Sequence, residues 1–228
     1  MALVRHWREA HRMPLNTKNL LAAIQEVKSK ATERKFSQSI DLAINLQNID
    51  MKKPEGRIQE SIELPHSVGK ELKVCVIATG EMALKAKKAG ASLVLERAAL
   101  EALVGDKKKQ KDLASNYDVF IAEAPLMPLV GKSLGASLGP RGKMPTPVPP
   151  NADITEQIER HRRMVLVRMR GQPVIQCRVG TEDMKDEEIA ENVQAVVRRI
   201  EAKLKRGIKN FRSVYLKTSM GSPVKVTM

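Results

Sequence analysis

Hydrophobic and polar residues alternate near the beginning of the chain and again towards its end. Within residues 36–46, one side carries Ile40, Leu42 and Ile44, while the other side is polar. A period of two residues predicts a strand with one buried and one polar face. The same pattern predicts further strands, two of which flank Gly171-Gln172-Pro173 as a hairpin. These further strands are 58–64, 164–170, 174–179, 214–217 and 224–226.

Two other segments carry apolar residues at helical spacing. Between 16 and 31 they recur every three or four residues, and Asn16 or Thr17 can cap the helix. Residues 186–206 begin with acidic side chains and end with basic ones, and Gly207 predicts the stop. Strands and helices of this kind are typical of an α+β domain.

The middle of the chain has a different pattern. Residues 73–78 and 117–123 are continuous apolar runs, as expected for strands that are covered on both faces. Helical segments and a short apolar run at 92–95 accompany them, which predicts a parallel sheet with covering helices. The proline-rich residues 147–150 indicate a linker of restricted flexibility. The helical segments are 81–89, 97–103, 107–115 and 126–138.

Together these patterns predict a discontinuous protein of the α/β class. An α+β domain is made from residues 1–67 and 155–228, and an α/β domain of residues 68–154 is inserted into it. Because the chain crosses twice between them, the two domains can hinge. A basic turn at 52–56 joins the first two strands.

Charge is distributed unevenly between these domains. The 228 residues carry a formal net charge of +14 at pH 7. The split domain has 27 Lys and Arg against 17 Asp and Glu, and therefore holds +10 of this surplus. A surplus of this size suggests a polyanionic partner, either nucleic acid or an anionic membrane surface. Only six residues are aromatic, which counts against modules that stack bases on rings.

The sequence gives no sign of a membrane segment or a metal site. No run approaches the ~18 apolar residues of a membrane span, and the first residues lack the apolar core of a secretory signal. We expect a soluble, cytoplasmic protein without membrane contacts. Cys75 and Cys177, the only cysteines, lie in apolar runs and are expected to be buried free thiols. The four histidines show no metal-ligand spacing, so we expect no metal and no cofactor.

Candidate enzyme motifs are incomplete. Gly131-Lys132-Ser133 resembles the end of a phosphate-binding loop, but Leu126 stands where the first glycine is required. Gly135, Gly139 and Gly142 have the wrong spacing for a dinucleotide fingerprint. We therefore predict no enzyme. The alternative is a nucleotide- or phosphometabolite-binding enzyme that uses the α/β insert.

Two polar sites are better candidates for binding. Arg168 and Arg170 lie on one face of a predicted strand, where a guanidinium is well placed for phosphate or base contacts. In segment 218–223, Gly221 lets the backbone approach a ligand closely, and Met220 can pack flat against a base or sugar. The residues alone leave open whether this segment binds a ligand or is a connecting turn capped by hydroxyls.

Several motifs resemble one protein family. Residues 129–135 and the following Gly139–Pro145 resemble the characteristic pattern of large-subunit ribosomal protein one, the protein of the mobile stalk. The match spans nearly the whole chain, and Arg141-Gly142-Lys143-Met144 is closer to the archaeal pattern than to the bacterial one. The other matching motifs, in family order, are Arg34-Lys35-Phe36, Leu64-Pro65-His66 with Gly69-Lys70, and Thr218-Ser219-Met220-Gly221.

The resemblance implies a split RNA-binding domain with a Rossmann-like insert. It implies membership of the large ribosomal subunit, binding to large-subunit ribosomal RNA at the stalk, and assistance in releasing deacylated tRNA from the exit site. It also implies binding to the protein's own mRNA and repression of its translation. We expect a monomer when the protein is free. The residues that match the family's RNA contacts are Lys35, Phe36, Ser39, Asp41, Arg168, Thr218, Ser219, Met220 and Gly221.

Three of these positions differ from the bacterial pattern of the family. Ser39 and Ser219 replace threonine, and Asp41 replaces glutamate of the bacterial pattern, so hydroxyl and carboxylate chemistry is kept. By strict alternation Phe36 falls on the apolar side, and contacts RNA only if it lies at the strand's edge.

We expect Gly139–Pro145 to be structural or to contact tRNA. A third hypothesis, a DNA-compacting protein, predicts no preference for folded RNA over duplex DNA.

Overall fold

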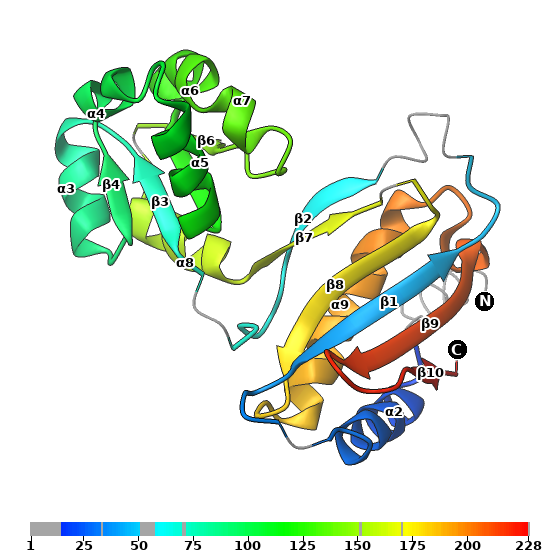
Figure 1. Ribbon diagram of the computed structural model, residues 1–228. Helices are drawn as coiled ribbons and strands as arrows, with labels where there is room; N and C mark the ends of the chain where they lie inside the picture. The colour runs from blue at the N-terminus through cyan, green and yellow to red at the C-terminus, as the bar shows by residue number, and fades with distance from the viewer. Residues whose placement is uncertain are drawn as a thin grey trace, which may run out of the picture. The chain divides into compact units, whose positions relative to one another are not determined.

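A computed structural model gives the fold of residues 15–32, 34–50, 58–69, 72–150, 152–169 and 171–227 (Figure 1). The chain forms two compact units. The first, called here the split unit, comprises Met1–Gly69 and Arg163–Met228. The second, called the α/β unit, comprises Lys70–Arg162. Helices accompany both parallel and antiparallel strands, which confirms the predicted α/β class.

The split unit contains a four-stranded antiparallel sheet with β1 (Ser39–Leu46) near its centre. β1 pairs with β8 (Val174–Thr181) on one side and with β9 (Phe211–Thr218) on the other. β10 (Val224–Val226) extends the sheet beyond β9. Strands from both parts of the split sequence are therefore interleaved, so neither part can form this sheet alone.

Helices cover one face of this sheet. α9 (Asp186–Lys203) lies behind β8 and β1 in Figure 1, and α2 (Thr17–Ser29) packs against α9, β9 and β10. In β1 the side chains of Ile40, Leu42 and Ile44 are fully buried, whereas every second residue is partly exposed. The predicted alternation of β1 is confirmed, and its polar face points away from the core.

The ends of both helices follow local chemistry. Asn16 caps α2, because its side chain accepts a hydrogen bond from the Lys18 N–H at 3.1 Å. α9 ends at Lys203, three residues before the predicted end at 206. Leu204 leaves the helical conformation and buries its side chain in the core, and Gly207 then opens the 3-10 helix η3 (Gly207–Asn210).

The predicted hairpin around residues 171–173 is wrong. β7 (Met164–Arg168) pairs antiparallel with β2 (Gln59–Glu63) in a separate two-stranded sheet, while β8 pairs with β1. Alternation shows which face of a strand is buried but does not identify its partner. The predicted basic turn at 52–56 lies outside the described residues.

The α/β unit has a parallel sheet in the order β4-β3-β5-β6. Core residues form two clusters, one against each face of this sheet, as expected for strands covered on both sides. The strands are β3 (Val74–Ile77), β4 (Leu93–Leu95), β5 (Val119–Glu123) and β6 (Thr146–Val148). The helices are α3 (Gly80–Lys88), α4 (Arg97–Ala102), α5 (Lys107–Asn116), η2 (Ala124–Leu126), α6 (Met127–Ser133), α7 (Gly135–Leu138) and α8 (Ile154–Arg162).

The structure differs from the predicted organisation at residues 147–150 and at the domain boundary after residue 154. The predicted linker at 147–150 begins inside β6, an edge strand, where Pro147 is tolerated because an edge position needs fewer backbone donors. The predicted boundary after residue 154 assigns α8 to the split domain, but α8 packs on α3 and β3. Ile154 and Ile158 are buried in the core of the α/β unit, so this unit extends to Arg162.

Candidate nucleic-acid interface

The start of β1 and the end of β9 meet at one end of the antiparallel sheet. The Ser219 N–H and the Ser219 hydroxyl both donate to the Ser39 carbonyl oxygen, at 3.0 and 3.3 Å. The Met220 N–H donates to the Gln38 side-chain oxygen at 3.1 Å. We call Ser39 and Thr218–Gly221 the turn cluster. Five of the predicted contact residues, far apart in sequence, therefore lie together.

Gln38 fixes the geometry of the turn cluster from beneath. Its side chain is buried, and its amide nitrogen also donates to the Thr32 carbonyl oxygen at 2.9 Å. The backbone carbonyl of Gln38 accepts a hydrogen bond from the Glu182 N–H at 3.1 Å. The turn is thereby tied to three separate stretches of chain, so it is preorganised.

Thr218 and Gly221 close the turn around a narrow space. The Gly221 N–H donates to the Thr218 carbonyl oxygen at 3.2 Å. A Cβ atom at position 221 would lie 2.2 Å from the Thr218 hydroxyl oxygen, so only glycine fits without rearrangement. The Thr218 side chain is buried, and its hydroxyl has no hydrogen-bond partner among the described residues. The buried Thr218 side chain therefore packs beneath the turn and is not exposed to solvent.

Two large apolar side chains are exposed at this end of the unit. Met220 is 60% exposed and Phe36 is 55% exposed. The prediction that Phe36 lies on the buried side is wrong, because β1 begins only at Ser39 and the alternation does not extend back to position 36. Lys35 is exposed as well. The Lys35 and Phe36 side chains are thus exposed to solvent in the segment that precedes β1.

Asp41 lies between two cations on the open face of the sheet. It is directly opposite Arg178 of β8 and Lys217 of β9 in the strand register. Burial raises the pKa of the Asp41 carboxyl, and the positive charges of Lys217 and Arg178 partly oppose this increase. Lys217 and Arg178 are not among the residues predicted from the sequence, because only cross-strand register places them beside Asp41.

The open face continues along the sheet away from the turn cluster. Ala43 of β1 lies opposite Gln176 and Tyr215, and Lys225 of β10 lies opposite Tyr215. Asn45 donates from its side chain to the Ser213 hydroxyl at 2.9 Å. This face therefore presents amides, hydroxyls and cations, with Asp41 as the carboxylate on the described part of β1.

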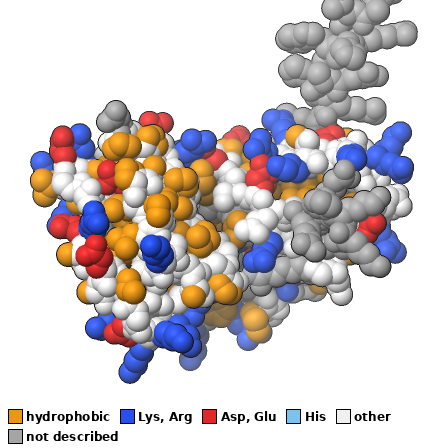
Figure 2. Space-filling view, turned by 90° about the horizontal axis from the view of Figure 1, so that it is seen from above, with side chains coloured by type: hydrophobic (Ala, Val, Ile, Leu, Met, Phe, Trp, Pro, Cys, Tyr) orange, Lys and Arg blue, Asp and Glu red, His pale blue; other side chains and the backbone are white. Residues whose placement is uncertain are grey.

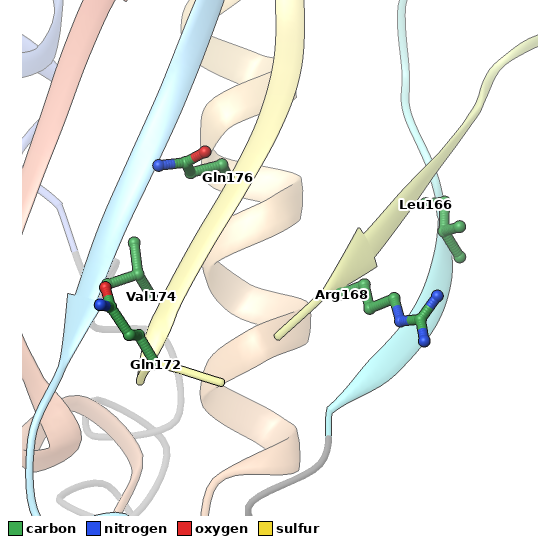
Figure 3. Close-up of a pocket in the computed structure, with 5 residues that line it drawn as sticks. All are labelled: Leu166, Arg168, Gln172, Val174 and Gln176. Atoms are coloured by element: carbon green, nitrogen blue, oxygen red, sulfur yellow. The ribbon is translucent and has the colours of Figure 1, made fainter. Parts of the chain in front are cut away.

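Arg168 is not part of the turn cluster. It lies on β7 and lines a trough of about 410 Å³ between β7 and β8, together with Leu166, Gln172, Val174 and Gln176 (Figure 3). The trough flanks the Val174 end of β8, whereas the turn cluster lies beside the Thr181 end. At about 3.3 Å per residue, the two sites are roughly 17–23 Å apart along the strand. Arg170 is outside the described residues.

Two candidate phosphate positions in the described part of the α/β unit are closed by the protein's own groups. Gly131-Lys132-Ser133 forms the end of helix α6, and the Ser133 hydroxyl donates to the Leu129 carbonyl oxygen at 3.0 Å. At the start of α3, the Thr79 N–H and hydroxyl both donate to the Glu123 carboxylate, at 3.1 and 2.9 Å. A carboxylate of the protein itself therefore occupies the position where a phosphate would bind.

The Gly139–Pro145 loop is anchored within the α/β unit. The Lys143 ammonium donates to the carbonyl oxygens of Ala114 and Tyr117, at 3.0 and 2.6 Å, where helix α5 ends. Arg141 donates to the Ser115 hydroxyl at 2.8 Å. Gly142 adopts a left-handed backbone conformation with φ of 72°. These contacts give the loop a structural role.

The α/β unit also carries exposed apolar residues, namely Leu84, Val104 and Met144. Figure 2 shows hydrophobic side chains gathered on the face of this unit that is turned to the viewer, at the left of the view, with charged side chains of both signs between them.

The cysteines and His66 have ordinary structural environments. Cys75 and Cys177 are buried free thiols, as predicted, and burial raises the pKa of each to about 12. His66 contacts the Glu191 carboxylate at 2.7 Å through its Nε2 atom. Among the described residues, no group of three or more His, Cys, Asp or Glu side chains is placed to hold a metal ion. No described helix has the length and apolarity of a membrane span.

Sequence comparison places the chain among the ribosomal proteins. Residues 17–222 match the family model described as Ribosomal protein L1p/L10e, and the chain belongs to this family. The similarity is to structural proteins of the ribosome and not to enzymes.

Curated relatives from archaea match over almost their full length. A protein of Methanocella arvoryzae is 46% identical over 209 residues, covering 92% of this chain and 98% of the relative. A protein of Pyrococcus abyssi is 45% identical over 216 residues, covering 94% and 98%. Both relatives are named large ribosomal subunit protein uL1. The resemblance seen in the sequence motifs is confirmed.

Proposed function

We propose that this protein is part of the large ribosomal subunit and binds large-subunit ribosomal RNA through the turn cluster and the adjoining open sheet face. The observation that carries the proposal is the set of hydrogen bonds that tie Ser219 and Met220 to residues 38 and 39. They hold a polar turn rigidly while the Met220 side chain stays exposed. Preorganised polar groups beside an exposed apolar side chain suit the sugar edges of a folded RNA.

Charge and recognition have separate sources in this proposal. The split unit supplies general attraction to phosphates through its surplus of +10. Ser39, Ser219 and Asp41 offer hydroxyl and carboxylate groups, which can pair with the 2′-hydroxyls of an RNA minor groove. Lys217 and Arg178 flank Asp41 and offset its repulsion of phosphate. Recognition therefore does not require the aromatic platforms that the sequence lacks.

The first test is the variant Met220→Asp in the full chain. It places a negative charge on an exposed side chain of the turn cluster, so the fold should persist while affinity for large-subunit ribosomal RNA falls about tenfold or more. Affinity is measured by filter binding at several salt concentrations. Ile208→Asp is the matched control, because Ile208 is also an exposed apolar residue of the split unit, in η3.

Two results would contradict the proposal. Equal RNA affinity of Met220→Asp and the parent would remove the turn cluster from the interface. Equal affinity of the parent for duplex DNA and for folded RNA would favour the DNA-compacting hypothesis.

Calorimetric titration of the full chain with ATP tests the enzyme alternative. We expect no ATP binding, because the Glu123 carboxylate occupies the position where a phosphate would bind.

Two finer roles are part of the same proposal. We infer that the protein assists release of deacylated tRNA from the exit site and represses translation of its own mRNA through the same turn cluster. The support is the family membership together with a single preorganised surface that any RNA of similar shape would use. Competition between the mRNA leader and ribosomal RNA tests the second role. Met220→Asp should weaken both complexes by the same factor.

A further inference from the structure

The trough between β7 and β8 gathers polar side chains that are left without partners. Arg168, Gln172 and Gln176 make no side-chain hydrogen bond or ion pair within the described part of the chain. Figure 3 shows Gln172 and Gln176 on the β8 side and Arg168 on the β7 side. Gln38 and Gln47 in the same unit, by contrast, donate to backbone carbonyl oxygens. The trough residues are thus available for an external ligand.

The apolar part of the trough is also exposed. Leu166 of β7 is 40% exposed, and Val174 of β8 lines the same trough. The trough volume of about 410 Å³ falls within the range of about 300–1,000 Å³ that is typical of ligand clefts. The site therefore combines an aliphatic surface, a guanidinium plane and two amides.

No carboxylate is among the described residues that line this trough. Glu60 of the neighbouring strand β2 is turned to the other side, where it pairs with Arg199 at 2.5 Å and with Lys203 at 3.9 Å on α9. The cross-strand neighbours of Arg168 and Leu166 are Gln59 and Ser61, which are uncharged. Within the part of the chain that the structure describes, no carboxylate therefore neutralises the Arg168 charge, and an anionic ligand is favoured.

We propose that this trough binds one unpaired nucleotide of the RNA, an inference that rests on the proposed function above. Unpaired bases are recognised by hydrogen bonds to their edges and by stacking on guanidinium planes as well as on aromatic rings. Gln172 and Gln176 each offer a donor and an acceptor to a base edge. Arg168 contacts the phosphate or stacks on the base, and Leu166 with Val174 supports the apolar face of the nucleotide.

The position of the trough fits a ligand that also reaches the turn cluster. Gln176 of the trough lies on the open face of the antiparallel sheet, opposite Ala43, and most of the length of β8 separates the trough from the turn cluster. A folded RNA fragment is long enough to contact both. A single-stranded interruption of its helix would then fall on the trough while its helical part contacts the turn cluster.

Site-directed crosslinking tests this assignment with the full chain. Cys75 and Cys177 are buried with pKa values of about 12, so a thiol introduced by Gln172→Cys, at an exposed trough position before β8, can be labelled selectively with an azidophenacyl group. The labelled protein is mixed with transcribed large-subunit ribosomal RNA of Methanocella arvoryzae and irradiated. We expect crosslinks at one or two adjacent nucleotides that are unpaired in the free RNA. Crosslinks confined to base-paired nucleotides would overturn the proposal.

A second labelled variant separates this proposal from the proposed function. Ser222→Cys carries the label at an exposed position next to the turn cluster. Crosslinks from Ser222→Cys without any from Gln172→Cys would overturn the trough assignment and leave the proposed function intact. An absence of crosslinks from both, with Met220→Asp binding like the parent, would contradict the proposed function itself.

Affinity measurements give an independent result. The double variant Gln172→Ala with Gln176→Ala should lower RNA affinity about two- to tenfold for each hydrogen bond lost. The loss should disappear when the crosslinked nucleotide is removed from the RNA. Gln25→Ala, an exposed glutamine on α2, is the matched control and should bind like the parent. An equal loss with both RNAs would overturn the proposal.

Discussion

The two units each contain a four-stranded sheet, but they cover it differently. In the α/β unit, Phe120 and Ala122 of β5 belong to a core cluster on one face, and Ile121 belongs to a cluster on the other. In the split unit one large cluster covers a single face, and Asp41 and Ala43 line the opposite face. The antiparallel sheet therefore keeps one face free for a polyanion, whereas both faces of the parallel sheet are covered.

The largest expected effect comes from placing the same charge in both sheets. Ala122 of β5 is fully buried, and Ala43 of β1 is partly exposed on the open face. Ala122→Glu buries an unpaired carboxylate and should destabilise the α/β unit by about 3 kcal/mol or more. Ala43→Glu should change the free energy of unfolding by only about 0.5 kcal/mol. Urea unfolding followed by circular dichroism measures both.

The same pair also separates stability from binding. Ala43→Glu adds a negative charge to the proposed interface and should weaken RNA binding although the fold is kept. If Ala43→Glu destabilised the protein as much as Ala122→Glu does, the face that we describe as open would be a buried one.

The next effect concerns the turn cluster. Gly221→Ala forces a Cβ atom against the Thr218 hydroxyl, and such overpacking costs about 1–3 kcal/mol. The distorted turn should also lower RNA affinity. Thr218→Ala removes the hydroxyl that is in the way, so the double variant Thr218→Ala with Gly221→Ala should recover most of both losses. If the losses of the two single variants simply add in the double variant, the contact between position 221 and the Thr218 hydroxyl is not the cause of the losses.

A smaller effect is expected for the loop of the α/β unit. Lys143→Met removes two charge-assisted hydrogen bonds at the end of α5 and should cost about 1–2 kcal/mol. Lys132→Met is the control, because it removes the same charge from an exposed position on α6. Thermal unfolding compares their stabilities. RNA affinity of Lys143→Met should equal that of Lys132→Met, and a larger loss would give the loop a binding role.

The smallest effect is the pH dependence due to Asp41. Burial raises the pKa of this carboxyl above its ordinary value of 3.8, so folding favours the protonated form. The parent therefore loses stability as the pH rises from 3.8 through the raised pKa. Asp41→Asn lacks this loss and should be slightly more stable than the parent at neutral pH. The difference should vanish below pH 3.8 in urea unfolding, and a constant difference would contradict the assignment.

Local chemistry in the sequence was sufficient to predict several elements. The alternation of Ile40, Leu42 and Ile44 gives the buried face of β1 correctly, and Asn16 caps α2 as expected. The pattern could not identify the partner of β7, because β2 and β8 both offer a suitable alternating neighbour. Phe36 was misplaced because periodicity does not mark where a strand begins.

The candidate site was only partly accessible from sequence. Motif resemblance named Ser39 and Ser219, and the structure shows the hydrogen bonds that join them. Lys217 and Arg178 belong to no motif, and only the register of β1 with β8 and β9 places them beside Asp41. The trough beside Arg168 depends on the divergence of two sheets, which no local pattern reports.

The interleaved sheet has a consequence for synthesis of the chain. Lys70–Arg162 is one continuous stretch, so the α/β unit can fold while later residues are still being made. β1 must wait for β8 and β9, and the turn cluster exists only after Ser219 has reached the Ser39 carbonyl oxygen. A prematurely terminated chain therefore cannot display the proposed interface. Assembly into a ribonucleoprotein is in this way restricted to chains that were translated beyond β9 to at least Gly221.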